Sequence, residues 1–573
     1  MFDQGQSIVA YFTAVLLITA VGSMATAAAV WLRAPRPLAR LSRVLSAQYR
    51  VAFVLWWIAF TLDADLGTGA AVLLTAWILV HLGSLPWQII DEYLFADVLC
   101  RDARSPSERA ELIGGRRISV HVPCYAEPPE LVCRTLSALA LQRYADFEVL
   151  VVDNNTEDER LWRPVEEHCR ALGPRFRFLH VSPLSGAKAG ALNVALCHTA
   201  ADAELVAVLD CDYEASPDFL GALAGLFDDE RLAFVQTAHD YRDWANNAYQ
   251  RGCYGEYRTP YATYMVSRDA RGAPLTVGTM CLIRREALVR AGGWSSVCAT
   301  EDSELAIRLH AAGYRGRYVP VTLGRGLIPE TFAAYRRQRA RWIGGPVQEL
   351  RQHWRLYLPR RWARPSALSP AQKLLFAHHG MREAAAGVKA VAAVAAAAGA
   401  LVFAFRGTPP AELPAAAVVA MVTGTGAAAL VRWTLLRQAV CRSVRDSAHA
   451  LLASASLAYV ARVAAIRSLV GIREPWRRTV KFPASTSRWT AAVRSAGGEL
   501  VAGLAWLAVA AVVAVSWPGS ALAVLLALYL LCHAVACLAA PVLALRAERH
   551  LRRSAVRAPQ QARDRVCGRI PAI

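Results

Sequence analysis

Long apolar runs near both ends of the chain constrain its fold more than any other feature. Before residue 92 and again after residue 383, the sequence holds runs of about 20 apolar residues, the length a helix needs to cross a bilayer. Between these regions, short apolar stretches alternate with polar, helix-like stretches, as in soluble α/β proteins. At 573 residues, 55% of them hydrophobic, the chain is long enough for both parts.

Arginines flank the apolar runs and suggest how these runs are oriented. Basic residues favour the cytosolic side of a membrane, so the loop after the first run and the whole middle region are expected in the cytosol. The apolar segment 448–470 contains Arg462 and Arg467, and spanning would place the basic residues after it outside the cell. We therefore expect it to lie along the cytosolic surface, as does the basic amphipathic segment 351–364. Seven spans remain: residues 8–31, 49–66, 70–90, 388–405, 415–435, 500–517 and 521–545.

The formal net charge of +19 raises the question of a nucleic-acid partner. No nucleic-acid-binding motif is present, and membrane topology with anionic lipid accounts for the charge. We therefore expect a lipid bilayer and no nucleic acid among the partners. The 13 cysteines form no CxxC pair, which is typical of buried apolar side chains in a reducing compartment.

Three apolar stretches in the middle region, residues 118–123, 147–152 and 204–209, are expected to be strands, and each is followed by polar residues. An open parallel sheet collects such residues at its carboxyl edge, where ligands bind. No GxGxxG motif follows the first strand, so the pattern indicates a nucleotide site of another kind. Asp210 and Asp212, a DxD motif after the third stretch, are a candidate metal site, because Mg²⁺ prefers carboxylate oxygens and keeps positions open for a diphosphate.

Two further motifs lie close together, Thr300-Glu301-Asp302 and, later, Gln338 to Trp342 as QxxRW. The carboxylates precede an apolar run with helical spacing and should occupy the first turn of a helix, where the helix dipole favours negative charge. These carboxylates could serve a structural role, capping the helix, or a catalytic role, in which one of them acts as a general base. Trp342 offers a flat face for a sugar ring, and Arg341 suits phosphate.

Together, TED and QxxRW resemble the processive membrane glycosyltransferases of family 2, which include cellulose, hyaluronan and chitin synthases. The resemblance is strong over residues 115–345 and moderate over residues 470–485. It implies an α/β GT-A-type nucleotide-sugar domain inserted in an all-α transmembrane bundle, with Asp302 as catalytic base. The cofactor it implies is Mg²⁺ or Mn²⁺, held by Asp210 and Asp212.

The resemblance also assigns residues to the donor, the acceptor and a gating loop. Lys188 lies in a KAGxLN motif, and 234–239 resembles the FVQTPH segment of cellulose synthases, with alanine in place of proline. Residues 476–481 resemble the FxVTxK gating loop, with Arg478 in place of valine. The donor-binding residues implied are Tyr125, Glu127, Asp153, Lys188, Asp210, Asp212 and Lys481; the acceptor-binding residues are Gly278, Thr279, Glu301, Gln338, Arg341 and Trp342; the gate is Trp476, Thr479 and Lys481.

A further departure and one open segment accompany these assignments. The usual FFCGT motif is replaced by residues 275–279, Leu-Thr-Val-Gly-Thr, so the acceptor pocket is altered and the sugar and linkage are left open. Residues 240–268, rich in aromatic side chains, form either a substrate-facing insert or an ordinary packed region.

The function expected is a processive, inverting β-glycosyltransferase in the inner or plasma membrane, with a cytoplasmic catalytic domain. It would polymerise sugar from a UDP-sugar, UDP-glucose being favoured, into a β-glucan that crosses the membrane, with accessory export subunits as candidate partners. Two alternatives stay open: a non-processive enzyme that adds one sugar to a lipid carrier, and a non-catalytic exporter or scaffold. The first should lack QxxRW, and the second should have lost its carboxylates. The expected domains are 1–92, N-terminal spans; 93–350, GT-A domain; 351–495, interfacial helix, hairpin and gating region; 496–545, C-terminal hairpin; and 546–573, basic cytosolic tail.

Overall fold

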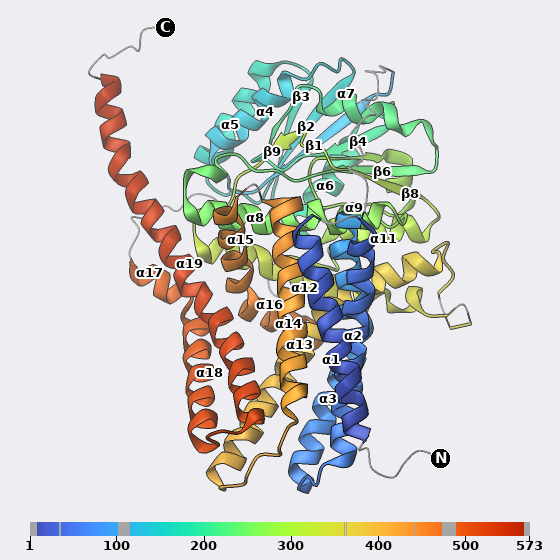
Figure 1. Ribbon diagram of the computed structural model, residues 1–573. Coiled ribbons are helices and arrows are strands. Elements are labelled where there is room, and N and C mark those ends of the chain that lie inside the picture. Colours follow the sequence, from blue (N-terminus) through green and yellow to red (C-terminus); the bar gives the residue numbers. More distant parts are fainter. Residues whose placement is uncertain are drawn as a thin grey trace.

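The computed structural model describes residues 8–33, 36–100, 115–359, 361–362, 364–441, 443–472 and 489–566. An α/β domain lies at one end of a bundle of long helices (Figure 1). The two parts alternate along the chain, because the first three helices belong to the bundle, the middle of the chain forms the α/β domain, and the chain then returns to the bundle. This is the inserted-domain arrangement that the apolar runs predict.

The α/β domain is built on a seven-stranded sheet of order β3-β2-β1-β4-β7-β6-β8. The first four strands in this order are parallel, as expected, but β7 pairs antiparallel with both β4 and β6, so the sheet is mixed rather than wholly parallel. A separate ribbon pairs β5 with β9. The strands are β1 Ile118–Cys124, β2 Phe147–Asn154, β3 Phe176–Val181, β4 Leu205–Val208, β5 Glu214–Ala215, β6 Leu232–Thr237, β7 Cys281–Arg284, β8 Arg315–Val319 and β9 Gly324–Arg325.

Helices cover both faces of this sheet and bury its alternating side chains. Leu205 and Ala207 of β4 enter one core and Val206 and Val208 enter the other, the period of two that a strand imposes. Covering a sheet on both faces is what makes its central strands apolar throughout. The helices of the domain are α4 Pro129–Ala140, α5 Glu159–Leu172, α6 Ala187–His198, α7 Phe219–Ala224, α8 Ala248–Ala262, α9 Tyr264–Asp269, α10 Arg285–Arg290, α11 Glu301–Ala311 and α12 Phe332–Tyr357, with short turns η2 Gly225–Asp228 and η3 Trp244–Asn246.

Eight helices in the described part of the chain are long and apolar enough to cross a membrane, one more than the seven expected. The additional one, Val444–Leu469, is the segment for which a surface position is predicted. The structure divides it at Leu457 into two helices, and its position relative to a bilayer stays a prediction. The bundle consists of α1 Ile8–Trp31, α2 Arg36–Asp63, α3 Thr68–Ala96, η1 Asp97–Cys100, α13 Pro370–Phe405, α14 Ala415–Leu435, η4 Leu436–Val440, α15 Val444–Ser456, α16 Ala458–Leu469, α17 Trp489–Ser495, α18 Gly497–Ser516 and α19 Ala521–Val566.

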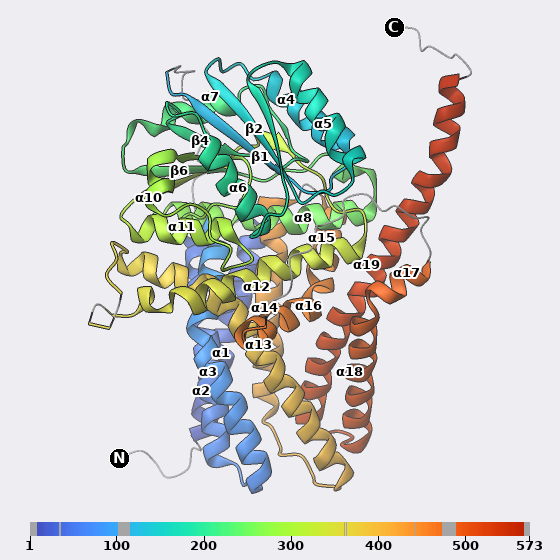
Figure 2. The ribbon, with the colours of Figure 1, turned by 180° about the vertical axis from the view of Figure 1, so that it is seen from behind.

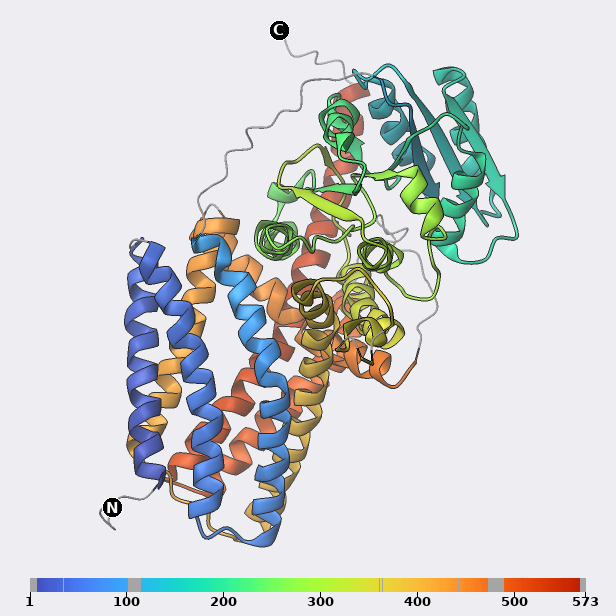
Figure 3. The same ribbon diagram turned by 90° about the vertical axis from the view of Figure 1, so that its right-hand side faces the viewer.

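Helices α8, α12, α15 and α16 join the two parts of the molecule. From behind, α12 runs across the end of the bundle beneath the sheet (Figure 2). α15 packs on α8, and α16 packs on α12 and α13. The side view shows the sheet set off to one side of α1 to α3 (Figure 3). The predicted boundary at residue 350 falls inside α12, so the predicted interfacial segment begins as the last turns of the helix that carries QxxRW.

Candidate active site

A cavity of about 180 Å³ lies at the carboxyl ends of β1 and β4, between the sheet and α12. The loop after β1, the loop after β4, α6, α11 and α12 all contribute to its walls, so motifs more than 200 residues apart in sequence meet in one place. The lining residues are Pro123, Cys124, Tyr125, Glu127, Asn154, Lys188, Asp210, Cys211, Asp212, Tyr213, His239, Tyr241, Val277, Ala299, Thr300, Glu301, Asp302, Gln338, Arg341 and Trp342.

The DxD motif lies directly beyond β4, where the parallel register brings it beside the end of β1. The backbone N–H of Asp210 donates to Thr279 Oγ1 at 2.9 Å, and Asp212 Oδ2 accepts from the Leu327 backbone N–H at 3.0 Å. Cys211, between them, belongs to the buried core, as expected of a small apolar side chain. Thr279 therefore acts through Asp210, since it does not itself line the cavity.

Lys188, near the start of α6, connects the DxD and TED motifs. Its Nζ donates to Asp210 Oδ1 at 2.5 Å and to the Gly278 carbonyl at 2.7 Å, and lies 3.9 Å from Glu301 Oε1. Burial opposes its charge, but Asp210, Glu301 and Asp302 outweigh burial and raise the pKa of Lys188 above its usual value. A permanently charged ammonium thus lies among carboxylates, in a position suited to an anionic ligand.

Asp302 occupies the first turn of α11, as the sequence predicts. Its Oδ1 accepts from the Ser303 backbone N–H at 2.7 Å. Burial first, and then the neighbouring Glu301 carboxylate, raise the pKa of Asp302 to about 7, while Lys188 opposes this rise. A carboxyl group with a pKa near neutrality is a general base well matched to physiological pH.

Gly278 allows the loop before β7 to approach Asp302. Its φ is +80°, and a Cβ at this position would lie 2.6 Å from Asp302 Oδ2 and 3.2 Å from Lys188 Nζ. Only glycine meets both conditions, the left-handed backbone and the close approach. The departure at Val277 lies next to this contact, and Val277 lines the cavity.

The QxxRW motif lies on α12 and forms the opposite wall. Tyr257 on α8 donates to Gln338 Oε1 and packs edge-on against Trp342, with ring centroids 5.4 Å apart. Arg339 pairs with Glu256 at 2.5 Å and lies 5.2 Å over the Trp342 ring. Burial lowers the pKa of Arg341, although carboxylates in the cavity oppose this shift. Gln338, Arg341 and Trp342 all line the cavity.

Asp153 is the predicted donor residue that the structure does not bring into the cavity lining. Its Oδ1 accepts from Thr156 Oγ1 at 2.7 Å, and its Oδ2 lies 2.9 Å from His180 Nδ1. Thr156 Oγ1 also accepts from the Ala126 backbone N–H at 2.8 Å. Asp153 therefore supports the loop that carries Tyr125 and Glu127, which do line the cavity.

The segment 240–268, left open by the sequence, is a packed region for the most part. Tyr249 and Tyr257 of α8 are fully buried, and Tyr257 contacts three residues of the cavity lining, Gln338, Trp342 and Tyr241. Tyr241 and His239 line the cavity although the sequence does not predict them as site residues. For His239, its place in the FVQT-like motif is the feature of the sequence that points to the site. The gate residues Trp476, Thr479 and Lys481 lie outside the described residues.

The residues beside the cavity fit a hard divalent cation. Asp210 and Asp212 both line the cavity, and their side chains offer oxygen ligands only. Among the described residues, no group of three or more His, Cys, Asp or Glu side chains is arranged around one point, so a metal here would depend on a bound diphosphate for its remaining ligands.

Comparison with known proteins gives the same assignment for this part of the chain. Residues 116–345 match the protein family described as "Glycosyltransferase like family 2". The chain is 28% identical over 323 residues to "Cellulose synthase 1 catalytic subunit [UDP-forming]" of Komagataeibacter xylinus, which covers 54% of this chain and 41% of that protein. It is 28% identical over 240 residues to the "Cellulose synthase catalytic subunit [UDP-forming]" of Xanthomonas axonopodis pv. citri, covering 40% of this chain and 31% of that protein.

A solved structure, "Mannosyltransferase PcManGT from Pyrobaculum calidifontis in complex with GDP-Man and Mn2+", aligns with a TM-score of 0.46 at 20% identity, over 70% of this chain and 100% of that one. This chain spans less than half the length of the two cellulose synthase subunits that it matches. Residues 116–345 form a glycosyltransferase family 2 domain, carried between two sets of membrane-type helices.

Proposed function

We propose that this protein is a processive, inverting β-glycosyltransferase that polymerises the sugar of UDP-glucose into a β-glucan and passes the polymer across the membrane. One observation carries the proposal: a candidate base, a DxD pair, a partly buried lysine and three QxxRW side chains all line a single cavity between the sheet and α12.

Asp302 is the base of the proposed reaction. Its carboxylate takes the proton of the acceptor hydroxyl as the acceptor oxygen attacks the anomeric carbon of the donor. The bond from that carbon to the phosphate oxygen breaks, UDP leaves with the electron pair, and the configuration inverts in this single displacement. Gly278 keeps the space beside Asp302 Oδ2 open for the approaching hydroxyl.

Lys188 and Arg341 hold the donor diphosphate. Both are cationic and line the cavity, and Lys188 reaches Asp210 and Gly278 from the N-terminal turn of α6. A Mg²⁺ or Mn²⁺ ion held by Asp210 and Asp212 would supply further charge neutralisation for the diphosphate. Tyr125 and Glu127, which also line the cavity, take the uracil end, and Asp153 keeps their loop in place through Thr156.

Trp342 and Gln338 bind the acceptor end of the glycan. The Trp342 ring lines the cavity and is held by contacts with Tyr257 and Arg339, and an indole ring is a surface on which a sugar can stack between additions. Retaining the product at this position is what processive addition requires. The gate formed by Trp476, Thr479 and Lys481 and any accessory export subunits belong to this proposal through the resemblance alone.

The test uses membrane vesicles that contain the full chain, supplied with radiolabelled UDP-glucose and Mg²⁺. The product is sized and digested with linkage-specific glucanases. High-molecular-weight, glucanase-sensitive material is the expected result. A single labelled lipid would overturn processivity, and no incorporation from any UDP-sugar would overturn the enzyme class.

A further inference from the structure

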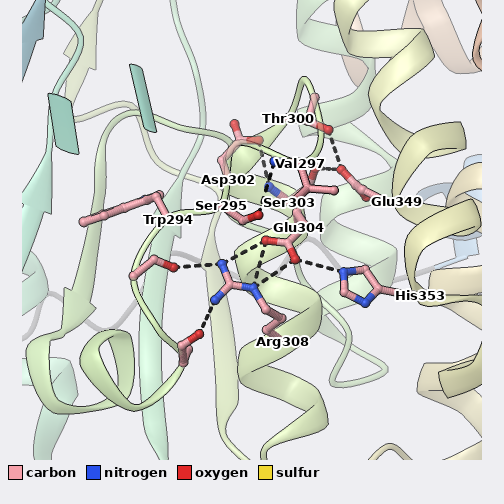
Figure 4. A network of polar contacts seen from close by, with 12 residues as sticks. Trp294, Ser295, Val297, Thr300, Asp302, Ser303, Glu304, Arg308, Glu349 and His353 are labelled. Carbon is pink, nitrogen blue, oxygen red and sulfur yellow. Dashed lines mark hydrogen bonds and ion pairs between the residues drawn. The ribbon is translucent and has the colours of Figure 1, made fainter. Parts of the chain in front are cut away.

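Glu349 lies on α12 beneath the TED motif and contacts the turn that carries the candidate base. Its Oε1 accepts two hydrogen bonds at 2.5 Å each, from Thr300 Oγ1 and from Ser303 Oγ. These two hydroxyls flank Glu301 and Asp302 in sequence. Figure 4 shows Glu349 pointing from α12 toward both hydroxyls, with Asp302 on the far side of the same turn. One carboxylate oxygen therefore fixes the first turn of α11 from below.

The environment of Glu349 makes this contact costly to break. Its side chain is 1% exposed, and its Oε2 lies 3.8 Å from His379 Nε2 on α13. Burial raises the pKa of Glu349 to about 8, while the bonds from Ser303 and Thr300 oppose this rise. Removing this acceptor takes a partner from two hydroxyls, and that of Ser303 is itself buried, so its lost hydrogen bond is not readily replaced by water.

Gly345 shows that the approach of α12 to Thr300 is tight. A Cβ at Gly345 would lie 2.2 Å from Thr300 Oγ1 and 2.5 Å from its Cγ2. Gly345 and Glu349 are four residues apart and so lie on one face of α12. Gln338 is eleven residues before Glu349, close to three helical turns, and lies on that face as well. The helix face that lines the acceptor side of the cavity thus continues into the contact with the TED turn.

We propose that Glu349 is a positioning residue, which holds the turn bearing Asp302 against the helix bearing Gln338 and Trp342 through its hydrogen bonds to Thr300 and Ser303. The inference rests on the proposed function, since it gives Asp302 the role of base. It adds to that function a residue outside both motifs. Through it, the distance between the base and the acceptor-binding side chains depends on one buried carboxylate.

A second contact between the same helices supplies the matched control. His353 Nε2 on α12 lies 2.9 Å from Glu304 Oε1, an oxygen that Arg308 also binds at 2.9 Å. In Figure 4 the side chains of this cluster lie below the hydroxyls of Thr300 and Ser303, and no dashed line joins them to Glu349. His353→Gln therefore alters a contact between α11 and α12 that involves neither the Thr300 nor the Ser303 hydroxyl.

The experiment compares Glu349→Ala, Glu349→Gln and Gly345→Ala with His353→Gln in the full chain. A Gly83→Ala variant controls for adding a methyl group to a helix, because a Cβ there meets nothing within 4 Å. Two quantities are measured: kcat and donor KM for sugar transfer, and the hydrogen exchange of backbone amides in residues 300–308. Hydrogen exchange reports on the first turn of α11 whether or not the enzyme transfers sugar.

Glu349→Ala and Gly345→Ala should lower kcat by about 10- to 100-fold, the usual effect of a small misplacement of a reacting group, and leave donor KM unchanged. Both should speed exchange in residues 300–308. Glu349→Gln should keep most of kcat, because its amide oxygen still accepts both hydroxyls. The two control variants should match the wild type in both measurements.

Three results would overturn the inference: a lowered melting temperature with wild-type kcat in Glu349→Ala, an equal loss of kcat in His353→Gln, or unchanged exchange in residues 300–308. A wild-type chain that transfers no sugar from any UDP-sugar would overturn the proposed function instead. In that case, exchange in the variants still decides whether Glu349 holds the turn.

Discussion

At the scale of single residues, the role of Asp302 is the sharpest point to test. Asp302→Asn keeps the size and the hydrogen bond from Ser303 but cannot take a proton. Transfer should fall by about 10²- to 10⁴-fold, the usual contribution of a general base, while UDP affinity stays at the wild-type value. Transfer is measured with labelled donor, and UDP binding by calorimetry. Asp202→Asn, at a surface carboxylate paired with Arg117, is the control. Loss of UDP binding in Asp302→Asn would move this residue to a donor-binding or structural role.

The raised pKa of Asp302 predicts the pH dependence of the reaction. The base must be ionised, so transfer should be fully present above the pKa of about 7 and fall tenfold per pH unit below it. Glu301 raises this pKa, so Glu301→Gln should move the acid limb of the kcat profile to lower pH, by about one unit. The profile is measured from pH 5 to 9. A limb that stays in place in Glu301→Gln would show that another group controls it.

Gly278 offers a further prediction at the scale of single residues, and the chain supplies a matched control for it. Gly278→Ala forces a side chain into a left-handed backbone, which costs about 1–2 kcal/mol, and places its Cβ 2.6 Å from Asp302 Oδ2. Gly272, at φ +65°, has nothing within 4 Å of such a Cβ, so Gly272→Ala carries the backbone cost alone. The melting temperature should fall in both variants, and further in Gly278→Ala because of the added clash, whereas kcat should fall only in Gly278→Ala. Equal kcat in the two variants would remove Gly278 from the site.

At the scale of elements, the strands and the first turn of α11 follow from local patterns. The apolar run of β1 and the carboxylates before Leu305 and Ile307 carry their own signals of strand and helix start. The direction of β7 does not follow from a local pattern, since β7 comes after the long segment that contains α8 and α9. The continuity of α12 past residue 350 does not follow from one either, because QxxRW and the basic turns after it differ in composition although they form one helix. The contact between Glu349 and Thr300 joins elements that sequence periodicity treats separately.

The packing of α8 on α15 leads to a prediction at this scale. A Cβ at Gly255 would lie 2.6 Å from Ala450 Cβ and 3.3 Å from Cys441 Sγ. Gly255→Ala gains about 1 kcal/mol of helix propensity but overpacks the contact at a cost of about 1–3 kcal/mol, so the melting temperature should fall. The double variant Gly255→Ala with Ala450→Gly should recover part of the loss. Scanning fluorimetry in detergent checks both; a melting temperature that rises in Gly255→Ala would show that the helices separate freely.

At the scale of the whole molecule, the sequence predicts the order of the parts but not how they are joined. Apolar runs identify the bundle, and motif order identifies the inserted domain. The site in the inserted domain depends on contacts between side chains distant in sequence, such as Tyr257 with Gln338 and Trp342, and no pattern in a single sequence predicts these contacts. The same holds for the supporting role of Asp153, whose motif position indicates the donor while its partners, Thr156 and His180, are seen only in the fold.

Asp97 connects the bundle to the α/β domain through several hydrogen bonds and ion pairs. It is 4% exposed and accepts from Arg43 of α2 at 3.0 Å, from Arg271 at 3.0 and 3.2 Å, and from Ser267 of α9 at 3.2 Å. Asp97→Ala leaves two partly buried guanidinium groups unpaired, which costs about 3–5 kcal/mol for a buried pair.

An exposed pair is the comparison for Asp97. Asp218 binds Arg143 at 3.1 Å on the surface, so Asp218→Ala should cost less than about 1 kcal/mol. We therefore expect Asp97→Ala to lower the melting temperature of the full chain clearly more than Asp218→Ala, and Asp97→Asn, which still accepts hydrogen bonds, to lie between them. Because Asp97 touches neither donor nor acceptor, transfer by the folded fraction should persist at low temperature. Melting temperatures of Asp97→Ala and Asp218→Ala that coincide would show that the contacts of Asp97 do not hold the two parts together.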